Sequence, residues 1–327
     1  MTRRALRRPA RLLLAAIVAL ALAPGTWWRS ALPPPEFEGP LEITALVEPI
    51  GLTGSLKLSG AWQLDHANPF FGGFSTLTWL GDNRFLSGSD RALLLEFTLP
   101  GVNLSRASLR PAPAAAERTT EDLEAIARDP LTGQTWLAFE RDNLIERHDP
   151  DGTMRQVAPR QMAGWPDNGG AESLVRFSGG RFLVLGESRS APDGEMYPGL
   201  LFAADPVDGA AALAFGFSAP GGYRPVDAAQ LPDGRVMILL RRVDAYWPAR
   251  FSSALMVANP AGIAAGQGWS GEIVARLGPP DLAENFEGLA VVPRGADGAA
   301  DLYLISDDNF SPGQRTLMLR IRWPGPG

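Results

Sequence analysis

The segment "ENFEGLAVVPRGADGAADLYLISDDNF", residues 284–310, contains two apolar runs joined by a glycine-rich turn, and carboxylates stand at the outer end of each run. Short apolar runs bounded by turn residues predict β-strands, and two such runs around a turn predict a hairpin. In an antiparallel hairpin, the start of the first strand and the end of the second strand lie at the same end. We therefore expect these acids to lie close together.

Four other segments repeat this pattern, and a third apolar run follows most of the hairpins. They are "FSTLTWLGDNRFLSGSD" (74–90), "LEAIARDPLTGQTWLAFERD" (123–142), "AESLVRFSGGRFLVLGESR" (171–189) and "VDAAQLPDGRVMILLRR" (226–242). The hairpins start 48 to 60 residues apart, close to the roughly 40 to 50 residues of a four-stranded propeller blade. A ring of such units leaves no sheet end exposed.

This repeat predicts an all-β fold, a β-propeller with five countable blades. Residues 41–70 contain two further strand-like runs. These runs either form a sixth blade or supply outer strands that close the ring together with the C-terminal "TLMLRIRW" (316–323).

The N-terminus has an arginine-rich start followed by an apolar run at residues 12–23. This run is shorter than the roughly 20 residues that span a bilayer and is typical of an export signal. We predict a signal peptide or an uncleaved membrane anchor at 1–30, a proline-rich spacer at 31–40, and the propeller domain at 41–327. The protein is then periplasmic or extracellular, with an uncleaved segment as its only link to the inner membrane; Sec and Tat export both remain open.

Composition excludes several classes of site. The chain has no cysteine and two histidines, so thiolate and multi-histidine metal sites are excluded. The net charge is −6, and removal of residues 1–23 with their five arginines leaves 25 basic against 36 acidic side chains, a net charge of −11. Nucleic acid is therefore not an expected partner. We expect a monomer that binds a small anionic or ester substrate.

The repeated register places acids from several hairpins around one mouth of a central channel. The first strands begin with Ser75, Glu124, Glu172, Asp227 and Glu287, and acids and arginines follow the second strands. A single acid is most often solvated or bonded to turn amides. Several acids at one register favour a functional cluster, since converging like charges are costly without a cation. Oxygen ligands without thiolates indicate Ca²⁺ or Mg²⁺.

Several motifs carry a family resemblance over about Phe71 to Trp323. They are "FGGFSTL" with "SGSDR", "NGGAESL" with "LGES", "LPDGRVMILLRR", and "ENFEGLAV" with "LYLISDDNFSPGQRTLML". They resemble the exported bacterial family called esterase-like activity of phytase. This resemblance implies a β-propeller, hydrolysis of esters or phosphoesters, and site positions at Asp90, Glu172, Glu187, Glu287, Asp307, Asp308 and Asn309. Ser75 and Arg241 depart from the acidic pattern.

We therefore predict a metal-dependent hydrolase of phosphate or other esters at the acidic rim. The expected calcium ligands are Asp90, Glu124, Glu140, Glu172, Glu187, Asp227, Glu287, Asp307, Asp308 and Asn309, with catalytic roles for Glu172, Glu287 and Asp307. Arg141, Arg189, Arg241 and Arg242 are expected to bind the substrate anion. The alternatives are a non-catalytic propeller that binds a ligand or protein, and a calcium-dependent lactone hydrolase.

Overall fold

The computed structural model describes residues 13, 16–18, 38–47, 50–99, 105–112, 122–189, 196–246, 249–279 and 282–326. The chain divides into two units, Met1–Glu36 and Phe37–Gly327. In the first unit, residues 13 and 16–18 are helical, and the rest of the expected export signal lies outside the described residues. None of the helices within the described ranges has the length and apolar character needed to cross a membrane.

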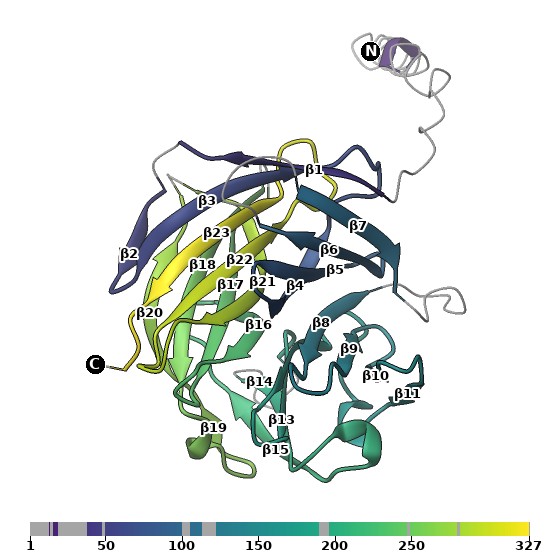
Figure 1. Cartoon of the computed structure of the whole chain (residues 1–327), viewed down its shortest axis with the longest axis vertical. Coiled ribbons are helices and arrows are strands. Elements are labelled where there is room, and N and C mark those ends of the chain that lie inside the picture. Colours follow the sequence, from purple (N-terminus) through teal and green to yellow (C-terminus); the bar gives the residue numbers. More distant parts are fainter. Residues whose placement is uncertain are drawn as a thin grey trace, which may run out of the picture. The chain divides into compact units, whose positions relative to one another are not determined.

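The second unit is a β-propeller, which confirms the predicted fold. Its inner strands contact one another in the cyclic order β4, β8, β12, β16 and β21, and β21 contacts β4 again. Figure 1 shows β4, β8, β16 and β21 around the middle of this unit. The bounds of the inner strands are β4 (Phe74–Gly81), β8 (Leu123–Arg128), β12 (Ala171–Arg176), β16 (Arg224–Gln230) and β21 (Asn285–Pro293).

Each inner strand begins a sheet that continues outward through the second and third strands of the predicted repeat. The first sheet adds β5 (Arg84–Ser89), β6 (Leu93–Thr98) and β7 (Ser105–Pro111). The second sheet adds β9 (Thr135–Phe139), β10 (Leu144–His148) and β11 (Met154–Val157). The third sheet adds β13 (Phe182–Gly186), β14 (Tyr197–Phe202), β15 (Ala212–Phe217) and β19 (Gly268–Trp269). The fourth sheet adds β17 (Val236–Tyr246), β18 (Ala249–Ala258) and β20 (Glu272–Leu277). The last adds β22 (Ala300–Asp307) and β23 (Leu317–Trp323).

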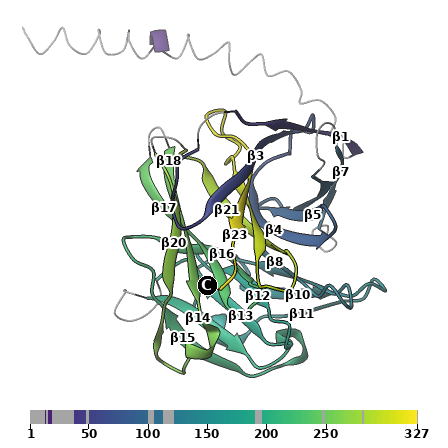
Figure 2. The ribbon, with the colours of Figure 1, turned by 60° about the vertical axis from the view of Figure 1, so that its left-hand side comes forward.

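The N-terminal strands lie on the outside of these sheets. β3 (Lys57–Asp65) pairs with the C-terminal β23, and β2 (Leu52–Gly54) pairs with β20. β1 (Glu38–Ala45) pairs first with β7 and then with β3, so it links the first and last sheets (Figure 2). Residues 38–65 thus supply outer strands of the sheets around the inner hairpins, and the pairing of β3 with β23 closes the ring.

The expected spacer at 31–40 is too long at its C-terminal end. Gly39 and Pro40 are already part of β1 and pair with Ala107 and Arg106 of β7. This half of β1 has a single partner strand, and proline is tolerated on such an edge because its missing N–H group faces no acceptor.

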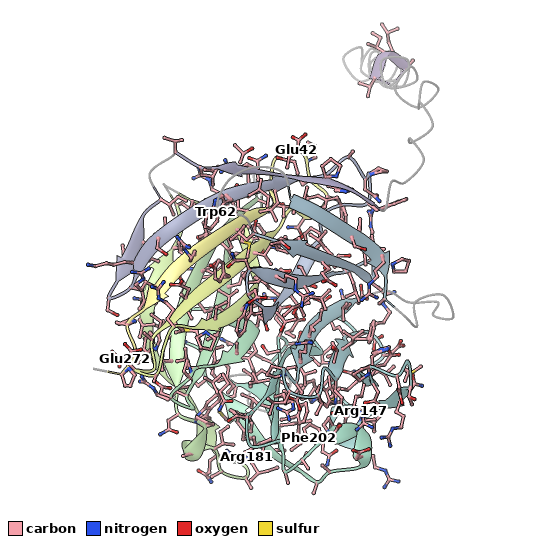
Figure 3. The ribbon with its side chains drawn as sticks, in the orientation of Figure 1. Glu42, Trp62, Arg147, Arg181, Phe202 and Glu272 are labelled. Atoms are coloured by element: carbon pink, nitrogen blue, oxygen red, sulfur yellow. The ribbon has the colours of Figure 1, made fainter. Side chains whose placement is uncertain are left out.

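Neighbouring sheets pack face to face through buried apolar side chains. One cluster joins Leu239 of β17 to Leu304 of β22 and Leu319 of β23. A buried ion pair adds to the packing between the second and third sheets: Arg147 of β10, labelled in Figure 3, binds Asp205 at 2.7 Å. The second and third strands of the repeat therefore both contribute side chains to the packing between sheets.

The closure of the ring can be tested at Leu319, which is fully buried. Leu319→Ala should lower the free energy of unfolding by about 2 to 5 kcal/mol, because it leaves a cavity between closely packed sheets. Urea denaturation measures this change. Arg322→Ala, on the same strand but half exposed, is the control, with an expected change below about 1 kcal/mol. Equal effects of the two substitutions would contradict the packing described here.

Candidate active site at the acidic end of the propeller

Each inner strand carries a β-bulge at the same place, close to its start. The strand pairing skips one residue in each hairpin. A bulged residue is left out of the hydrogen-bond ladder, and the strand bends there. The skipped residues, called the bulge residues below, are Ser75, Glu124, Glu172, Val226 and Glu287.

A second set of residues comes from the second strand of each hairpin. In each hairpin, the residue just before the bulge pairs with a residue of the second strand, and the residue meant here comes directly after that partner. The five positions are therefore equivalent. These strand-end residues are Asp90, Glu140, Glu187, Arg241 and Asp307. The two sets together contain seven carboxylates and one guanidinium, and we call these eight residues the acidic cluster.

The members of the acidic cluster interact around the whole ring. The carboxyl groups of Asp90 and Asp307 repel each other across the first and last hairpins, and Glu124 is close enough to be repelled by Asp90 and Glu140. Glu140 and Glu172 share a hydrogen bond. The predicted convergence of acids from distant parts of the chain is therefore present in the structure.

The structure corrects the register of Asp227. In the fourth hairpin the bulge residue is Val226, and Asp227 follows it. The carboxylate of Asp227 accepts hydrogen bonds from the backbone N–H groups of Leu289 (2.7 Å) and Ala228 (2.7 Å). Thr76, the equivalent residue of the first hairpin, likewise accepts from the backbone of the next inner strand, at Ile126 (3.1 Å). Asp227 thus links neighbouring inner strands and is not a member of the acidic cluster.

Arg241 is the cationic member of the acidic cluster. It donates hydrogen bonds to Glu187 and Glu287, which belong to the hairpins on either side, and to the amide oxygen of Asn285 (3.0 Å). Asn285 in turn donates to Glu287 (2.9 Å) and Asp307 (3.0 Å). The fourth hairpin, which has no acid in either set, therefore supplies the charge that compensates its neighbours.

Burial raises the pKa values of the remaining acids. Burial, with a smaller contribution from the Asp307 carboxylate, raises the pKa of Asp90 to about 7. Burial likewise raises the pKa of Glu140 to about 7 and that of Asp307 to about 6. The pKa values of Glu124 and Glu172 are also well above their usual range, first through burial and then through neighbouring carboxylates. The protein thus compensates poorly for negative charge on these five acids.

Asp308 and Asn309 have other partners. Asp308 accepts hydrogen bonds from the backbone of Gly73 (3.0 Å) and Phe310 (3.0 Å). Its carboxylate lies so close to Gly72 that a Cβ atom there would meet it at 2.5 Å, and the φ of Gly72 is +123°. The glycines of "FGG" are therefore required by the approach of the loop after β22. The side chain of Asn309 is exposed and donates to Gln314 (3.2 Å).

Three of the four predicted anion-binding arginines stand outside the acidic cluster, next to its strand-end residues. Arg141 pairs with Asp122 (2.8 Å), Arg242 pairs with Asp244 (2.8 Å), and Arg189 lies over the ring of Tyr197. All three are at least partly exposed.

Sequence reasoning did not assign a role to Asp122 or Arg224. The carboxylate of Asp122 contributes to the repulsion at Asp90 and Glu124, and Arg224 pairs with Glu187 at 3.3 Å. Each lies directly opposite a strand-end residue, Glu140 and Arg241 respectively, in its hairpin. Both lie two residues before the bulge residue of their hairpin, and this shared position is the signal that could have identified them.

The donor chemistry of the acidic cluster fits a hard cation. Carboxylates and the amide oxygen of Asn285 are the ligands that Ca²⁺ prefers, and no thiolate or histidine is present. In the described part of the chain, however, no three acids or histidines are arranged as the ligands of one ion. Glu187 and Glu287 are bound to Arg241 instead, and Glu140 accepts from the backbone of Gly170 (3.1 Å).

Residues 69–310, most of the chain, match the family described as "Phytase-like: Esterase-like activity of phytase". The chain belongs to this family. The match spans the inner hairpins from "FGG" to "DDNF", and it confirms the resemblance found in the sequence. Gly73, near the start of the match, donates a hydrogen bond to Asp308, near its end.

Solved structures also resemble this phytase-like chain. Virginiamycin B lyase from Staphylococcus aureus is 11% identical, with 86% of this chain and 99% of that chain covered and a TM-score of 0.42. A luciferin-regenerating enzyme is 11% identical over 88% and 96%, with a TM-score of 0.43. The WD40 β-propeller domain of Doa1 is 11% identical over 83% and 98%, with a TM-score of 0.39. No curated protein matches the chain.

The raised pKa values predict how stability depends on pH. Because the folded-state pKa values of Asp90, Glu140 and Asp307 exceed the unfolded values near 4, the folded state binds more protons between about pH 4 and pH 7. Stability is lost as pH rises through this range. In a chelating buffer, the melting temperature should fall by several degrees between about pH 5 and pH 8. A constant or rising melting temperature would contradict the buried, uncompensated charge.

Arg241→Met tests the compensating role of the guanidinium. The substitution leaves Glu187 and Glu287 without their shared donor, so the free energy of unfolding should fall by about 3 to 5 kcal/mol near pH 8. The loss should be smaller near pH 5, where more of the carboxyl groups are protonated. Arg242→Met, which removes a partly exposed arginine from the next position, is the control. Losses that do not depend on pH would contradict this role.

Proposed function

We propose that this phytase-like propeller is an exported hydrolase of phosphate or other esters, and that it uses a divalent cation, Ca²⁺, at the acidic cluster. The observation that carries the proposal is the gathering of seven carboxylates, of which Arg241 binds only Glu187 and Glu287 within the described residues. Burial, with repulsion between neighbouring carboxylates, raises the pKa values of Asp90, Glu124 and Glu140, and a bound cation would offset the cost of their charge. The apolar run at residues 12–23 supports export.

Glu124, Glu172, Glu287 and Asp307 are the residues proposed to hold the cation, with Asp90, Glu140 and Glu187 around them. When bound, Ca²⁺ polarises a phosphoryl or carbonyl oxygen and lowers the pKa of bound water. Selectivity for Ca²⁺ over softer metals follows from the all-oxygen donor set.

The chain itself supplies the proton transfer and the binding of the substrate. In this proposal Asp307, beside the cation, accepts a proton from the attacking water. Glu172 and Glu287 hold and orient the reacting groups from the bulges. Arg141, Arg189 and Arg242, at the edge of the acidic cluster, attract an anionic substrate and stabilise the leaving anion.

A non-catalytic propeller that binds a ligand at the same end is the second candidate. The observation that favours it is the fourth hairpin, where Val226 and Arg241 replace carboxylates and Arg241 already occupies two of them. Such a site binds a cation or a basic group without completing a catalytic ligand set.

Calcium titration with phosphomonoester and carboxyl-ester substrates separates these functions. The hydrolase predicts calcium-dependent turnover that falls at least about a hundredfold in the Glu287→Gln, Asp307→Asn double variant. Glu272→Gln, on the outer strand β20, should leave turnover unchanged. Calcium-dependent stabilisation with no turnover of any substrate would replace the hydrolase with the binding protein, and turnover unaffected by chelation would exclude the metal.

A further inference from the structure

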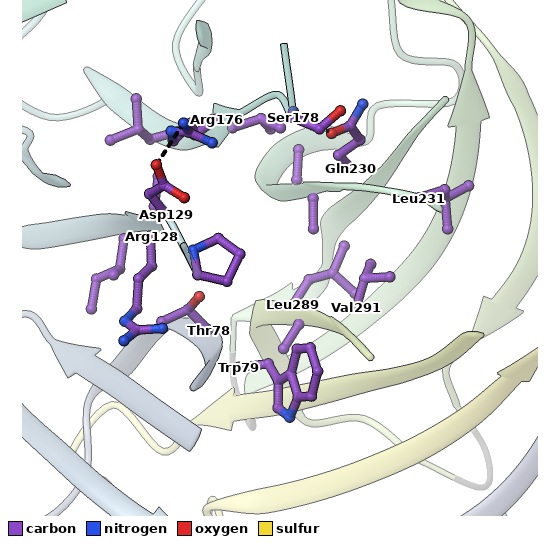
Figure 4. Close-up of a pocket in the computed structure, with 18 of the residues that line it drawn as sticks. Thr78, Trp79, Arg128, Asp129, Arg176, Ser178, Gln230, Leu231, Leu289 and Val291 are labelled. Carbon is purple, nitrogen blue, oxygen red and sulfur yellow. Dashed lines mark hydrogen bonds and ion pairs between the residues drawn. The ribbon is translucent and has the colours of Figure 1, made fainter. Parts of the chain in front are cut away.

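A cavity lies at the end of the propeller opposite to the acidic cluster. It has a volume of about 380 Å³, and its wall includes residues from the later part of all the inner strands (Figure 4). Pockets for small ligands typically enclose about 300 to 1,000 Å³. The bulge residues lie at the start of the same strands, so the two sites are separated along the axis of the propeller.

A ring of buried apolar side chains separates the two ends. These residues come two positions after the bulge residues on the inner strands, and each is at most 5% exposed. They are Leu77, Ile126, Leu174, Ala228 and Leu289. A ligand in the cavity is therefore in contact with this apolar ring and not with the carboxylates beyond it.

The wall of the cavity carries a net positive charge in a protein that is otherwise acidic. Its charged residues are Arg128, Asp129 and Arg176. Arg176 pairs with Asp129 at 2.7 Å, and Asp129 also accepts from the backbone of Leu131 (2.9 Å). Arg128 has no carboxylate partner in the part of the chain that the structure describes. Its charge is thus free to bind an anion.

The rest of the wall is suited to a flat apolar group. In Figure 4 the indole of Trp79 lies near Leu289 and Val291, and Arg128 reaches to Thr78 on the neighbouring part of the wall. Leu131, on the rim, is 93% exposed.

We propose that this cavity binds a small molecule with a flat apolar body and one carboxylate or similar monoanionic group. The anion binds the guanidinium of Arg128, and the body packs against Trp79 and Val291. The site is independent of the proposed hydrolysis, because the ring of buried apolar side chains lies between the cavity and the acidic cluster. A charge-assisted hydrogen bond in a partly buried wall makes the anionic group necessary for affinity.

The test uses 2-naphthoate and the uncharged 2-naphthamide, which has the same shape, as probes in isothermal titration with the whole protein. We expect saturable binding of 2-naphthoate and at least about tenfold weaker binding of the amide to the unaltered chain. Arg128→Gln should weaken binding of the acid about tenfold and leave that of the amide unchanged. Trp79→Leu should weaken both.

Arg181→Gln, which removes an exposed arginine outside the cavity, is the matched control and should leave both affinities unchanged. The Glu287→Gln, Asp307→Asn variant should also bind 2-naphthoate normally, which keeps this test separate from that of the hydrolase. Lack of saturable 2-naphthoate binding, or equal affinity for acid and amide in the unaltered chain, would overturn the proposal. So would the same affinity for the acid in the Arg128 and Arg181 variants.

Discussion

Seven carboxylates are held around one end of the propeller axis, and within the described residues Arg241 is the cationic member of their cluster. Like charges at this spacing repel strongly where burial removes water. Strand pairing fixes them there. The bulge is present at the start of every inner strand, whether its residue is a glutamate, Ser75 or Val226, so the backbone pairing determines the position. The fold therefore holds acids in positions where their negative charge is unfavourable.

The two ends of the axis differ in charge and in polarity. Carboxylates of the bulge and strand-end residues dominate one end, and the ring of buried apolar residues follows. The cavity at the other end contains Arg128, which has no carboxylate partner among the described residues. The two ends therefore present different chemical groups to a ligand. A single set of five strands provides both surfaces, since residues at the start and at the end of each strand face different ends.

Much of this arrangement could be predicted from the sequence. The turns "LGDNR", "FSGGR" and "LPDGR" mark hairpins, and their spacing predicts the propeller. The convergence of Glu124, Glu172 and Glu287 follows from their equivalent positions in the repeat together with the predicted ring of inner strands. The prediction failed at Asp227 because a bulge shifts the register by one residue, and nothing in "RPVDAAQ" shows which residue is skipped.

Other features depend on contacts between segments that the sequence does not align. The role of Asn285 as a bridge between Arg241, Glu287 and Asp307 requires the side-chain positions of neighbouring hairpins. The cavity around Arg128 is formed by inner strands and turns of different hairpins, so no single sequence motif predicts it.

The most direct measurement is a crystal structure of the protein grown with calcium, with anomalous scattering used to identify the ion. The proposal predicts an anomalous peak bonded to carboxylate oxygens of Glu172, Glu287 and Asp307, with Glu287 released from Arg241. Absence of a peak at saturating calcium, with Arg241 still bound to both of its neighbours, would contradict a cation site at the acidic cluster.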